Sequence, residues 1–386
     1  MYGDIMKLNL KSNKPLLIII SAAAGAAVIL ILLAYLFINR IFARINIVNS
    51  AEHNLQEGVE AGLADDNIYS FAGDEYEENS PLPDEDEELL SEDELAKLPE
   101  ATEEEIAELE RQLRNTEISD IKYDRNVYNI LLIGSDSRKG GARGRSDSMI
   151  LISINKKAKT ITTTSILRDI YLKIPGRETG NRINAAFAYG GADLLLDTIR
   201  QNFRIRVDKY VIIDFYAFID MVDSVGGITV EVSEEDIPVI NGYVRELNKL
   251  TGQDEELDCL TEAGKLLLNG KQALGYARNR YVGSDFARTA RQRKVLEQLF
   301  EKVKQLKLTA IKDLADKVLP KITTNLKEGE LLSLILSLPS YIKYDIKQVT
   351  IPAAGSYKDV KIRGMAVLAI DFEKNIKLLH ESIYGE

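Results

Sequence analysis

Two carboxylates and three guanidinium groups lie within one glycine-rich stretch of the sequence, between two short apolar runs. The first run ends at Ile133 and the second begins at Met149, which predicts a strand, a loop and a second strand. The charged groups are Asp136, Asp147, Arg138, Arg143 and Arg145, and the glycines are Gly134, Gly140, Gly141 and Gly144. Glycines allow the backbone to approach a ligand closely. Acidic and guanidinium groups in such a loop suit a phosphate ester with a bound divalent cation.

The two aspartates of this stretch stand at the two ends of the predicted loop. If the flanking strands pair as a hairpin, Asp136 and Asp147 come close enough to share one cation. Two carboxylates, completed by phosphate oxygens and water, form a coordination shell that Mg²⁺ commonly takes. Each aspartate could equally accept backbone hydrogen bonds in a turn at a strand end, and the spacing alone does not separate the two roles.

Arginines also accumulate at the ends of predicted elements elsewhere in the chain. A planar guanidinium group binds phosphate with two hydrogen bonds and keeps its charge at any relevant pH, so converging arginines would suit a pyrophosphate. The alternatives are exposed arginines at helix ends and, for Arg168 beside Asp169, a local ion pair. Sequence spacing does not show whether the arginines converge. They are Arg138, Arg145, Arg168, Arg278, Arg280, Arg288 and Arg291.

The other residue types exclude several kinds of catalysis. The chain has two histidines, His53 and His380, and one cysteine, Cys259, so we expect no histidine-based triad, thiolate metal site or internal disulfide. Neither a phosphate-binding P-loop motif nor the nucleophile elbow of serine hydrolases is present in the sequence. Aromatic residues are not interleaved with basic ones as on single-strand binding surfaces, so we expect no nucleic-acid partner.

The charge of the chain is concentrated in one segment. Residues 73–110 contain eighteen Asp or Glu residues and one Lys, a local charge of −17. Because the whole chain carries −11, the remaining residues carry +6. The sequence therefore predicts an acidic, solvated segment and a mildly basic folded part, which favours an anionic partner.

An uncharged apolar segment lies near the start of the chain, at residues 15–38. A helix of this length covers about 36 Å, which exceeds the hydrocarbon thickness of a bilayer, about 30 Å. The segment is longer than the apolar region of a cleaved signal peptide, so we expect one transmembrane helix. Three lysines in residues 1–14 favour a cytoplasmic N-terminus, which would place residues 39–386 outside the cytoplasm.

The rest of the chain divides into an acidic spacer, residues 39–120, and a folded domain, residues 121–386. Within the spacer, Thr102 and Glu105 form a capping box before apolar residues at helical spacing, which predicts a short helix. The domain contains strand patterns such as VYNILLI, SMILISI and KYVIIDF, and residues 183–203 predict a helix with a break at two glycines. Strands and helices in this irregular order predict an α/β or α+β sandwich.

At these residues the sequence resembles the LytR-CpsA-Psr family of membrane-anchored cell-wall enzymes. The matching pieces follow the order of the family and extend over about residues 122–305. They are NILLIGSDSR with GRSDSMILISI, SILRDIYLKIPG, RINAAFAYGG, VDKYVIIDFYAFIDMVDSVGGITVEV, and LNGKQALGYARNR with DFARTARQRKVL. The resemblance implies an α/β/α sandwich around a mixed central sheet, outside the cell membrane and facing the wall. It also implies a Mg²⁺-dependent phosphotransferase that moves a glycopolymer, such as teichoic acid or capsule, from a polyprenyl-pyrophosphate carrier to a peptidoglycan hydroxyl.

The resemblance also implies roles for individual residues. Asp136 and Asp147 correspond to the residues that face Mg²⁺, and the sequence does not tell which of them would take the proton from the acceptor hydroxyl. The pyrophosphate-binding arginines correspond to Arg145, Arg168, Arg278 and Arg280, and the remaining polar lining corresponds to Arg138, Asp285, Arg288 and Gln292. The acidic spacer is not part of the family pattern.

A polyprenyl carrier would also require an apolar tunnel. Candidates for its lining are Ala186, Phe187, Val211, Ile213 and Phe215, each of which could instead belong to the ordinary core. Two other functions stay open: a wall-associated regulator that binds polyprenyl lipids without turnover, and a pyrophosphatase that cleaves the carrier without joining glycan to the wall. The presence of both aspartates and of the arginine series favours the transferase.

Overall fold

The structure, a computed structural model, describes residues 46–47, 97–114, 121–135, 146–283, 285–306, 310, 314 and 316–385. Within these ranges the side chains of residues 46, 47, 112, 114, 147, 285 and 335 are outside the description. The predicted cytoplasmic segment 1–14, the predicted transmembrane segment 15–38 and most of the acidic spacer thus lie outside the described residues. Within the described ranges, no helix is both long and apolar enough to cross a membrane.

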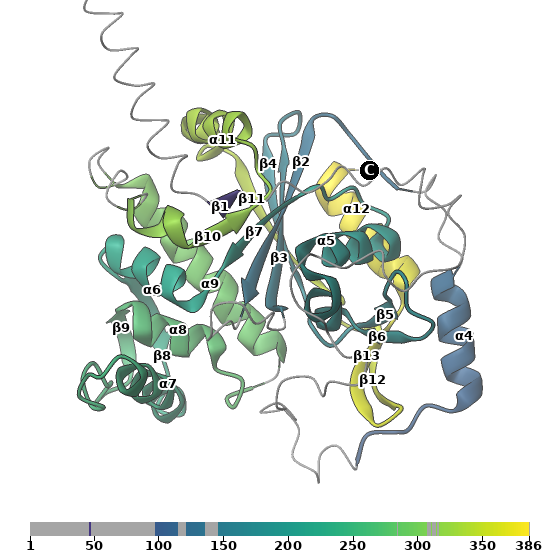
Figure 1. Ribbon diagram of the computed structural model, residues 1–386, viewed down its shortest axis with the longest axis horizontal. Coiled ribbons are helices and arrows are strands. Elements are labelled where there is room, and N and C mark those ends of the chain that lie inside the picture. The colour runs from purple at the N-terminus through teal and green to yellow at the C-terminus, as the bar shows by residue number, and fades with distance from the viewer. Residues whose placement is uncertain are drawn as a thin grey trace, which may run out of the picture. The chain divides into compact units, whose positions relative to one another are not determined.

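A seven-stranded mixed sheet forms the centre of the described part of the chain (Figure 1). Its strands are β1 (Asn46–Ile47), β2 (Val127–Ser135), β3 (Ser146–Asn155), β4 (Thr160–Ile166), β7 (Lys209–Ile213), β10 (Ile322–Thr324) and β11 (Asp345–Ile351). Their order across the sheet is β1, β10, β7, β2, β3, β4 and β11. β2 runs parallel to β7 and antiparallel to β3, while β4 runs antiparallel to β3 and parallel to β11.

Helices cover both faces of this sheet. The helices nearest to it are α5 (Ile183–Phe203), α6 (Phe215–Ser224), α9 (Asp285–Lys304), α11 (Glu328–Tyr341) and α12 (Phe372–Tyr384), with a 3-10 helix, η2 (Leu319–Lys321). α5 and α12 lie together on one face, and α6 and α9 lie on the other (Figure 1). The prediction of a mixed α/β fold around a mixed central sheet is therefore confirmed.

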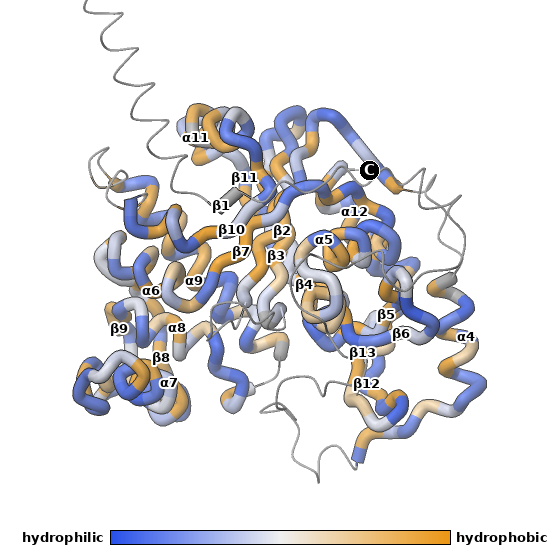
Figure 2. The backbone as a smooth tube through the Cα atoms, viewed as in Figure 1, coloured by the Kyte–Doolittle hydropathy of each residue, from blue (hydrophilic) through white to orange (hydrophobic). Residues whose placement is uncertain are grey.

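The main hydrophobic core lies between the sheet and the helices α5 and α12. Ile133, Met149 and Ile166 are register partners across β2, β3 and β4, and all three are buried. Figure 2 shows that β2, β3 and β7, in the middle of the sheet, are largely hydrophobic. As the sequence predicts, α5 is interrupted at Gly190 and Gly191, and Gly191 has a φ of 68°, which a side chain would disfavour.

The opposite face of the sheet is apolar but less completely buried. Leu132 and its register partner Val211 are only half-buried there, and so is Ile213. Ala186 and Phe187, which the sequence also suggests for a lipid tunnel, are instead buried in the main core, on the other side of the sheet. The sheet separates these two groups of candidates, so they do not line one common cavity.

A second hydrophobic core lies among α6, α9 and four further elements. These are β8 (Ile228–Val232), α7 (Asp236–Leu250), β9 (Gly264–Leu268) and α8 (Gly270–Arg278), and β8 and β9 form a separate two-stranded sheet. Asp214 directly follows β7, and its carboxylate accepts a hydrogen bond from the backbone of Ala217, 2.7 Å away, at the start of α6. Asn269 and Gln272 form a capping box that begins α8. These caps fix the start of α6, where Phe215 lies, and the start of α8, which ends at Arg278.

Helix α4 (Glu103–Arg114) lies within the region that the sequence predicts as a spacer. Thr102 and Glu105 make the predicted capping box, and Ile106 and Leu113 are buried in the main core. Glu110 is also buried. The helix packs near two small hairpins, formed by β5 (Tyr171–Lys173) with β6 (Gly180–Arg182) and by β12 (Tyr357–Ile362) with β13 (Met365–Ile370). Residues 97–114 thus belong to the compact domain, because their apolar face is needed to complete its core.

Candidate functional site

One edge of the central sheet collects the ends of several strands. Because β2, β4, β7 and β11 run in one direction and β3 in the other, the C-terminal ends of those four strands meet the N-terminal end of β3. We call this edge of the sheet the site edge. The residues that follow β2, β4 and β7 all start from it, which is the usual way in which a rigid sheet positions functional loops.

The pairing of β2 with β3 is irregular at the site edge. Gly134 pairs with Ser148 and Ser135 pairs with Ser146, which leaves Asp147 as an extra residue between the two pairs. Such a β-bulge bends the strand and is common beside active sites, where it redirects the chain. The backbone therefore has a special conformation at one of the two predicted metal-facing positions.

Several predicted site residues lie outside the described residues. These are Asp136, Arg138, Arg143 and Arg145, together with the side chains of Asp147 and Asp285. Residue 136 directly follows Ser135, whose strand position pairs with Ser146 at the other end of the loop. Among the side chains that the structure does describe, no group of three or more His, Cys, Asp and Glu residues could hold a metal ion.

Arg168 follows β4 at the site edge, as the sequence predicts. Its side chain is almost fully buried, with 2% of the residue exposed, and its Nε lies 3.5 Å from Oδ2 of Asp169. The local ion pair that the sequence offers as an alternative is therefore present. Burial of a charged guanidinium group is costly unless charges and hydrogen bonds compensate it, so this position is strongly specified by its surroundings.

Asp169 also interacts with a second arginine, which the sequence reasoning did not select. Nη1 of Arg182 lies 3.8 Å from Oδ1 of Asp169, so one carboxylate stands between the guanidinium groups of Arg168 and Arg182. Arg182 precedes α5 and begins the RINAAFAYGG piece. Arg182 could have been identified from the sequence, because it lies in one of the pieces that resemble the family.

Helix α9 brings further predicted residues to the same part of the sheet. Oε1 of Gln292 accepts a hydrogen bond of 3.1 Å from Oγ of Ser148, next to the bulge. Arg288, one turn earlier on α9, is buried, with 5% of the residue exposed. The structure thus places Gln292 beside the start of β3, although the two lie far apart in the sequence.

Arg278 ends α8, and its guanidinium group lies against two aromatic rings. Its Cζ is 4.3 Å from the ring centre of Phe215 and 4.7 Å from that of Tyr243. Phe215 is the second residue after β7, so this contact connects Arg278 to the site edge. Burial raises the pKa of Tyr243, and the positive charges of Arg278 and Arg280 oppose the shift.

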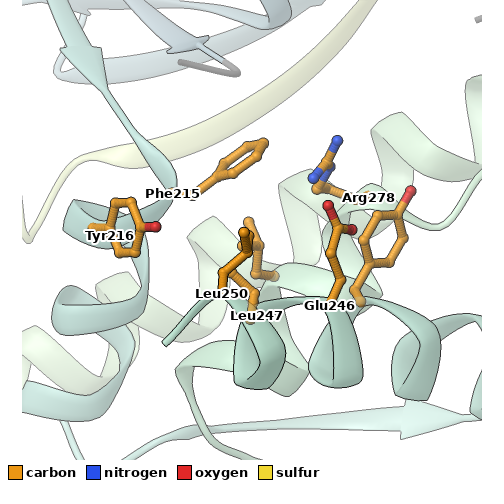
Figure 3. A pocket seen from close by; sticks show the side chains of 8 residues that line it. Phe215, Tyr216, Glu246, Leu247, Leu250 and Arg278 are labelled. Carbon is orange, nitrogen blue, oxygen red and sulfur yellow. The ribbon is translucent and has the colours of Figure 1, made fainter. Parts of the chain in front are cut away.

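An open pocket of about 350 Å³, including its mouth, adjoins Arg278. Figure 3 shows Glu246 and Arg278 side by side at one end, Tyr216 at the other end, and Leu247 and Leu250 below. The pocket is mostly apolar, with one acidic and one basic group on its wall. Its full lining is Phe215, Tyr216, Tyr243, Glu246, Leu247, Leu250, Leu274 and Arg278.

Arg291 has a different role from the other predicted arginines. Its Nη2 lies 3.0 Å from Oδ1 of Asp236, and its Nη1 donates a hydrogen bond of 3.1 Å to the carbonyl oxygen of Asn279. Asn279 is fully buried, and its Nδ2 donates to Asp236 Oδ1 at 2.7 Å. This network holds the chain between Arg278 and Arg280 in place, so Arg291 positions the arginines that the sequence grouped with it.

Taken together, these features define a mixed α/β domain in which several of the described arginines lie at or near one edge of the central sheet. A profile of the LytR_cpsA_psr family matches residues 96–381, so the chain belongs to this family. The resemblance seen in the sequence is thereby confirmed, and the match includes α4 as part of the domain.

Two curated relatives show how the family members are named. Biofilm regulatory protein A of Streptococcus mutans is 32% identical over 298 residues, which cover 69% of this chain and 71% of the relative. The polyisoprenyl-teichoic acid–peptidoglycan teichoic acid transferase TagV of Bacillus subtilis is 33% identical over 246 residues, which cover 62% of this chain. This chain spans 59% of the length of TagV.

Solved structures of TagT, a Bacillus subtilis protein, have a similar fold. TagT bound to LI-WTA aligns with a TM-score of 0.54 and 28% identity, covering 68% of this chain and 94% of TagT. TagT with bound octaprenyl pyrophosphate lipid aligns with a TM-score of 0.50 and 26% identity, covering 68% of this chain and 93% of TagT.

Proposed function

We propose that this chain is a phosphotransferase that moves a glycopolymer from a polyprenyl-pyrophosphate carrier to a hydroxyl group of peptidoglycan. Membership of the family supports the proposal, and so do the name of TagV and the octaprenyl pyrophosphate and LI-WTA bound in TagT. In this proposal residues 15–38 anchor the protein in the cell membrane by a single span. The N-terminus is cytoplasmic and the domain lies outside, near the wall.

The observation that carries the proposal is the gathering of predicted site residues at one edge of the sheet. Arg168 follows β4, Gln292 bonds to Ser148 at the start of β3, and Arg278 stacks on Phe215 after β7. Binding of a pyrophosphate requires several guanidinium groups that are already fixed in one place. Ordering these groups during the reaction would cost free energy. A rigid sheet edge supplies such fixed positions.

The chemistry is a displacement at phosphorus. The oxygen of the acceptor hydroxyl attacks the phosphorus on the sugar side, and the bond from that phosphorus to the bridging oxygen breaks. The electron pair of the broken bond stays on the bridging oxygen, so polyprenyl phosphate leaves, and the hydroxyl proton passes to a base. Arginines that bind the pyrophosphate stabilise the charge that develops on the leaving oxygen, which is how most of the rate arises in phosphoryl transfer.

The proposal includes a Mg²⁺ ion at the site edge. Residue 136 follows Ser135, which pairs with Ser146, and Asp147 follows in the bulge, so both predicted carboxylates start from adjacent strand ends. Asp136 and Asp147 would hold the ion, since two carboxylates with water and phosphate oxygens suit its octahedral preference. The ion would neutralise charge on the pyrophosphate oxygens. One of the two aspartates would also accept the proton of the hydroxyl group.

The apolar, half-buried face of the sheet is the place where the carrier lipid would bind. Leu132, Val211 and Ile213 lie on it, and Phe215 follows at the site edge. A lipid chain on this face would bury apolar surface that the protein itself covers only in part, which favours binding. Ala186 and Phe187 are excluded from this role because they lie in the main core.

The test is a reaction with the full-length protein, Mg²⁺, peptidoglycan and a polyprenyl-pyrophosphate-linked glycan. The proposal expects polyprenyl monophosphate to be released in step with glycan attached to peptidoglycan. Release of the carrier without attachment would identify a pyrophosphatase. Tight lipid binding without any product would identify a regulator, a function suggested by the name of the S. mutans relative.

A further inference from the structure

Arg293 is a charged residue on α9 that the proposed chemistry has not yet used. It is half-buried, and its Nη1 donates a hydrogen bond of 2.7 Å to Oγ1 of Thr350 and a longer one of 3.4 Å to Oγ of Ser165. Neutral hydroxyl groups are thus its hydrogen-bond partners among the residues that the structure describes. They orient the guanidinium group without neutralising it.

Arg291, two residues earlier on the same helix, differs from Arg293 because it has an acidic partner. Arg291 is paired with Asp236 at 3.0 Å, whereas Arg293 forms no ion pair with any described carboxylate. Burial lowers the pKa of Arg293, and no acidic group in the described part of the chain opposes that shift. A half-buried cation without an anion is unfavourable in the free protein. An anionic ligand would remove this penalty, which makes Arg293 a candidate binding residue.

The position of Arg293 indicates what kind of anion would reach it. Ser165 and Thr350 are register partners on β4 and β11, and the same row continues across the sheet through Ile150 and Leu132 to Val211. This row belongs to the apolar face opposite the main core. Ser165 and Ile150 are buried in this row, and the half-buried Leu132 and Val211 lie at its other end. Arg293 therefore places a positive charge at one end of a row that leads to half-buried apolar surface, which suits the head of an amphipathic anion.

The distance from the site edge makes the assignment more specific. Ser165 and Thr350 are each the last residue but one of their strands, β4 and β11, so both lie within one residue of the site edge. Arg293 thus lies at the site edge on the side of the apolar face, where the phosphate nearest to the lipid chain would lie if the chain covered that face.

We infer that Arg293 binds the phosphate that remains attached to the polyprenyl chain, in the carrier and in the polyprenyl monophosphate product. This inference rests on the proposed function. When the bridging bond breaks, its electron pair adds negative charge to this phosphate, and Arg293 stabilises that charge together with the arginines of the site edge. The ligand class is a phosphate monoester or diphosphate with a long apolar chain.

The test is equilibrium binding of radiolabelled polyprenyl monophosphate to the full-length protein in detergent. We expect Arg293→Gln to weaken binding by about tenfold to a hundredfold, the value of a hydrogen bond to a charged group. Polyprenol, which has the same chain and no phosphate, should bind wild type and variant equally. Arg293→Lys should retain part of the affinity, because it keeps the charge but loses the planar group.

The control is Lys294→Gln on the same helix. Lys294 is exposed and paired with Glu297 at 3.3 Å, so its removal causes the same change in net charge and should leave both affinities unchanged. Equal binding of polyprenyl monophosphate by wild type and Arg293→Gln would overturn the inference. So would an equal loss of polyprenol binding, because that would mean a structural effect.

The two proposals can fail separately. If wild type binds the monophosphate through Arg293 but transfers no glycan, the inference stands and the proposed transferase function fails. If wild type and Arg293→Gln transfer glycan at the same rate and bind the monophosphate equally, the transferase function stands and the inference fails.

Discussion

The guanidinium group of Arg278 lies between the rings of Phe215 and Tyr243, 4.3 Å from the first and 4.7 Å from the second. Phe215 begins α6 directly after β7 and its capping residue, and Arg278 ends α8. A guanidinium group held by two rings retains its charge and loses much of its freedom to rotate. Its hydrogen-bonding edge then points in a fixed direction, as binding of a pyrophosphate requires.

Replacing Phe215 should loosen Arg278 without removing its charge. Phe215→Leu keeps an apolar side chain, and the lost cation–π contact is worth about 0.5–2 kcal/mol. We expect the KM for the lipid-linked glycan to rise about two- to thirtyfold, with a smaller effect on kcat. Steady-state kinetics of glycan transfer would measure this.

The matched control for this prediction is Tyr123→Leu. The Cζ atom of Arg206 lies 4.7 Å from the ring centre of Tyr123, and Tyr123 is largely exposed. Tyr123→Leu therefore removes the same kind of contact at another place. An unchanged KM in Phe215→Leu, or an equal rise in Tyr123→Leu, would contradict the assigned role of the Phe215 ring.

The hydrogen bond between Ser148 and Gln292 should couple α9 to the bulged start of β3. Its length is 3.1 Å, and a neutral hydrogen bond of this kind contributes about 0.5–1.5 kcal/mol to stability. We expect Ser148→Ala and Gln292→Ala each to reduce the free energy of unfolding by about this amount, and the double variant to lose less than the sum.

Urea denaturation of the two single variants and the double variant measures the coupling. Strictly additive losses would show that the two side chains do not interact in solution. Glycan transfer should fall in parallel in all three variants, because the bulge at Asp147 lies directly beside this contact.

Glu110 should make the attachment of α4 depend on pH. It accepts hydrogen bonds from the hydroxyl of Tyr171 at 2.8 Å, the backbone of Gly180 at 3.2 Å and Nη1 of Arg363 at 3.2 Å. Burial by itself raises the pKa of Glu110, but these hydrogen bonds outweigh it and lower the pKa below its ordinary value of 4.5. Burial, together with the hydrogen bond to Glu110, raises the pKa of Tyr171 to about 12.

The sign of the effect follows from that lowered pKa. A carboxyl group that is more acidic in the folded state stabilises the protein above its ordinary pKa, and this contribution is lost as the pH falls through the folded value. The difference in unfolding free energy between wild type and Glu110→Gln should therefore be largest at neutral pH and shrink below pH 4.5. Glu108→Gln, on the exposed side of α4, should differ little from wild type at every pH. A difference for Glu110→Gln that is independent of pH would refute the prediction.

Local patterns in the sequence predicted much of the fold correctly, because they depend on residues that are close along the chain. The apolar runs around residues 129–149 become β2 and β3, and Thr102 with Glu105 begins α4. The sequence did not show that α4 completes the main core, since an amphipathic helix looks the same beside a domain as within one.

The parts that sequence patterns missed depend on which side of the sheet a segment covers. Ala186 and Val211 look equally suitable for a tunnel, and only the packing of α5 places them on opposite faces. Arg291 and Arg293 are the same residue type, two positions apart in the sequence, and only the fold gives one of them Asp236 as a partner. Arg182 was overlooked because its link to Asp169 is formed by tertiary structure.

The bulge at Asp147 leads to a prediction that separates metal binding from proton transfer. Asp136→Asn and Asp147→Asn should both reduce glycan transfer. The variant that loses a metal ligand should need about tenfold or more Mg²⁺ for half-maximal rate, because a charged oxygen ligand is replaced by a neutral one. The variant that loses the base should keep the Mg²⁺ dependence and lose the acidic limb of the pH–rate profile.

Titration of transfer activity with Mg²⁺ and with pH would make this assignment. Asp254→Asn is a suitable control, because Asp254 is exposed and caps a turn through the backbone of Glu256. Activity that survives in both aspartate variants, with unchanged Mg²⁺ and pH dependence, would mean that the aspartates serve only the loop backbone, the alternative that spacing alone leaves open. The irregular pairing of β2 with β3 argues against that outcome, because a hairpin whose ends needed only turn-stabilising aspartates would gain nothing from an extra residue at Asp147.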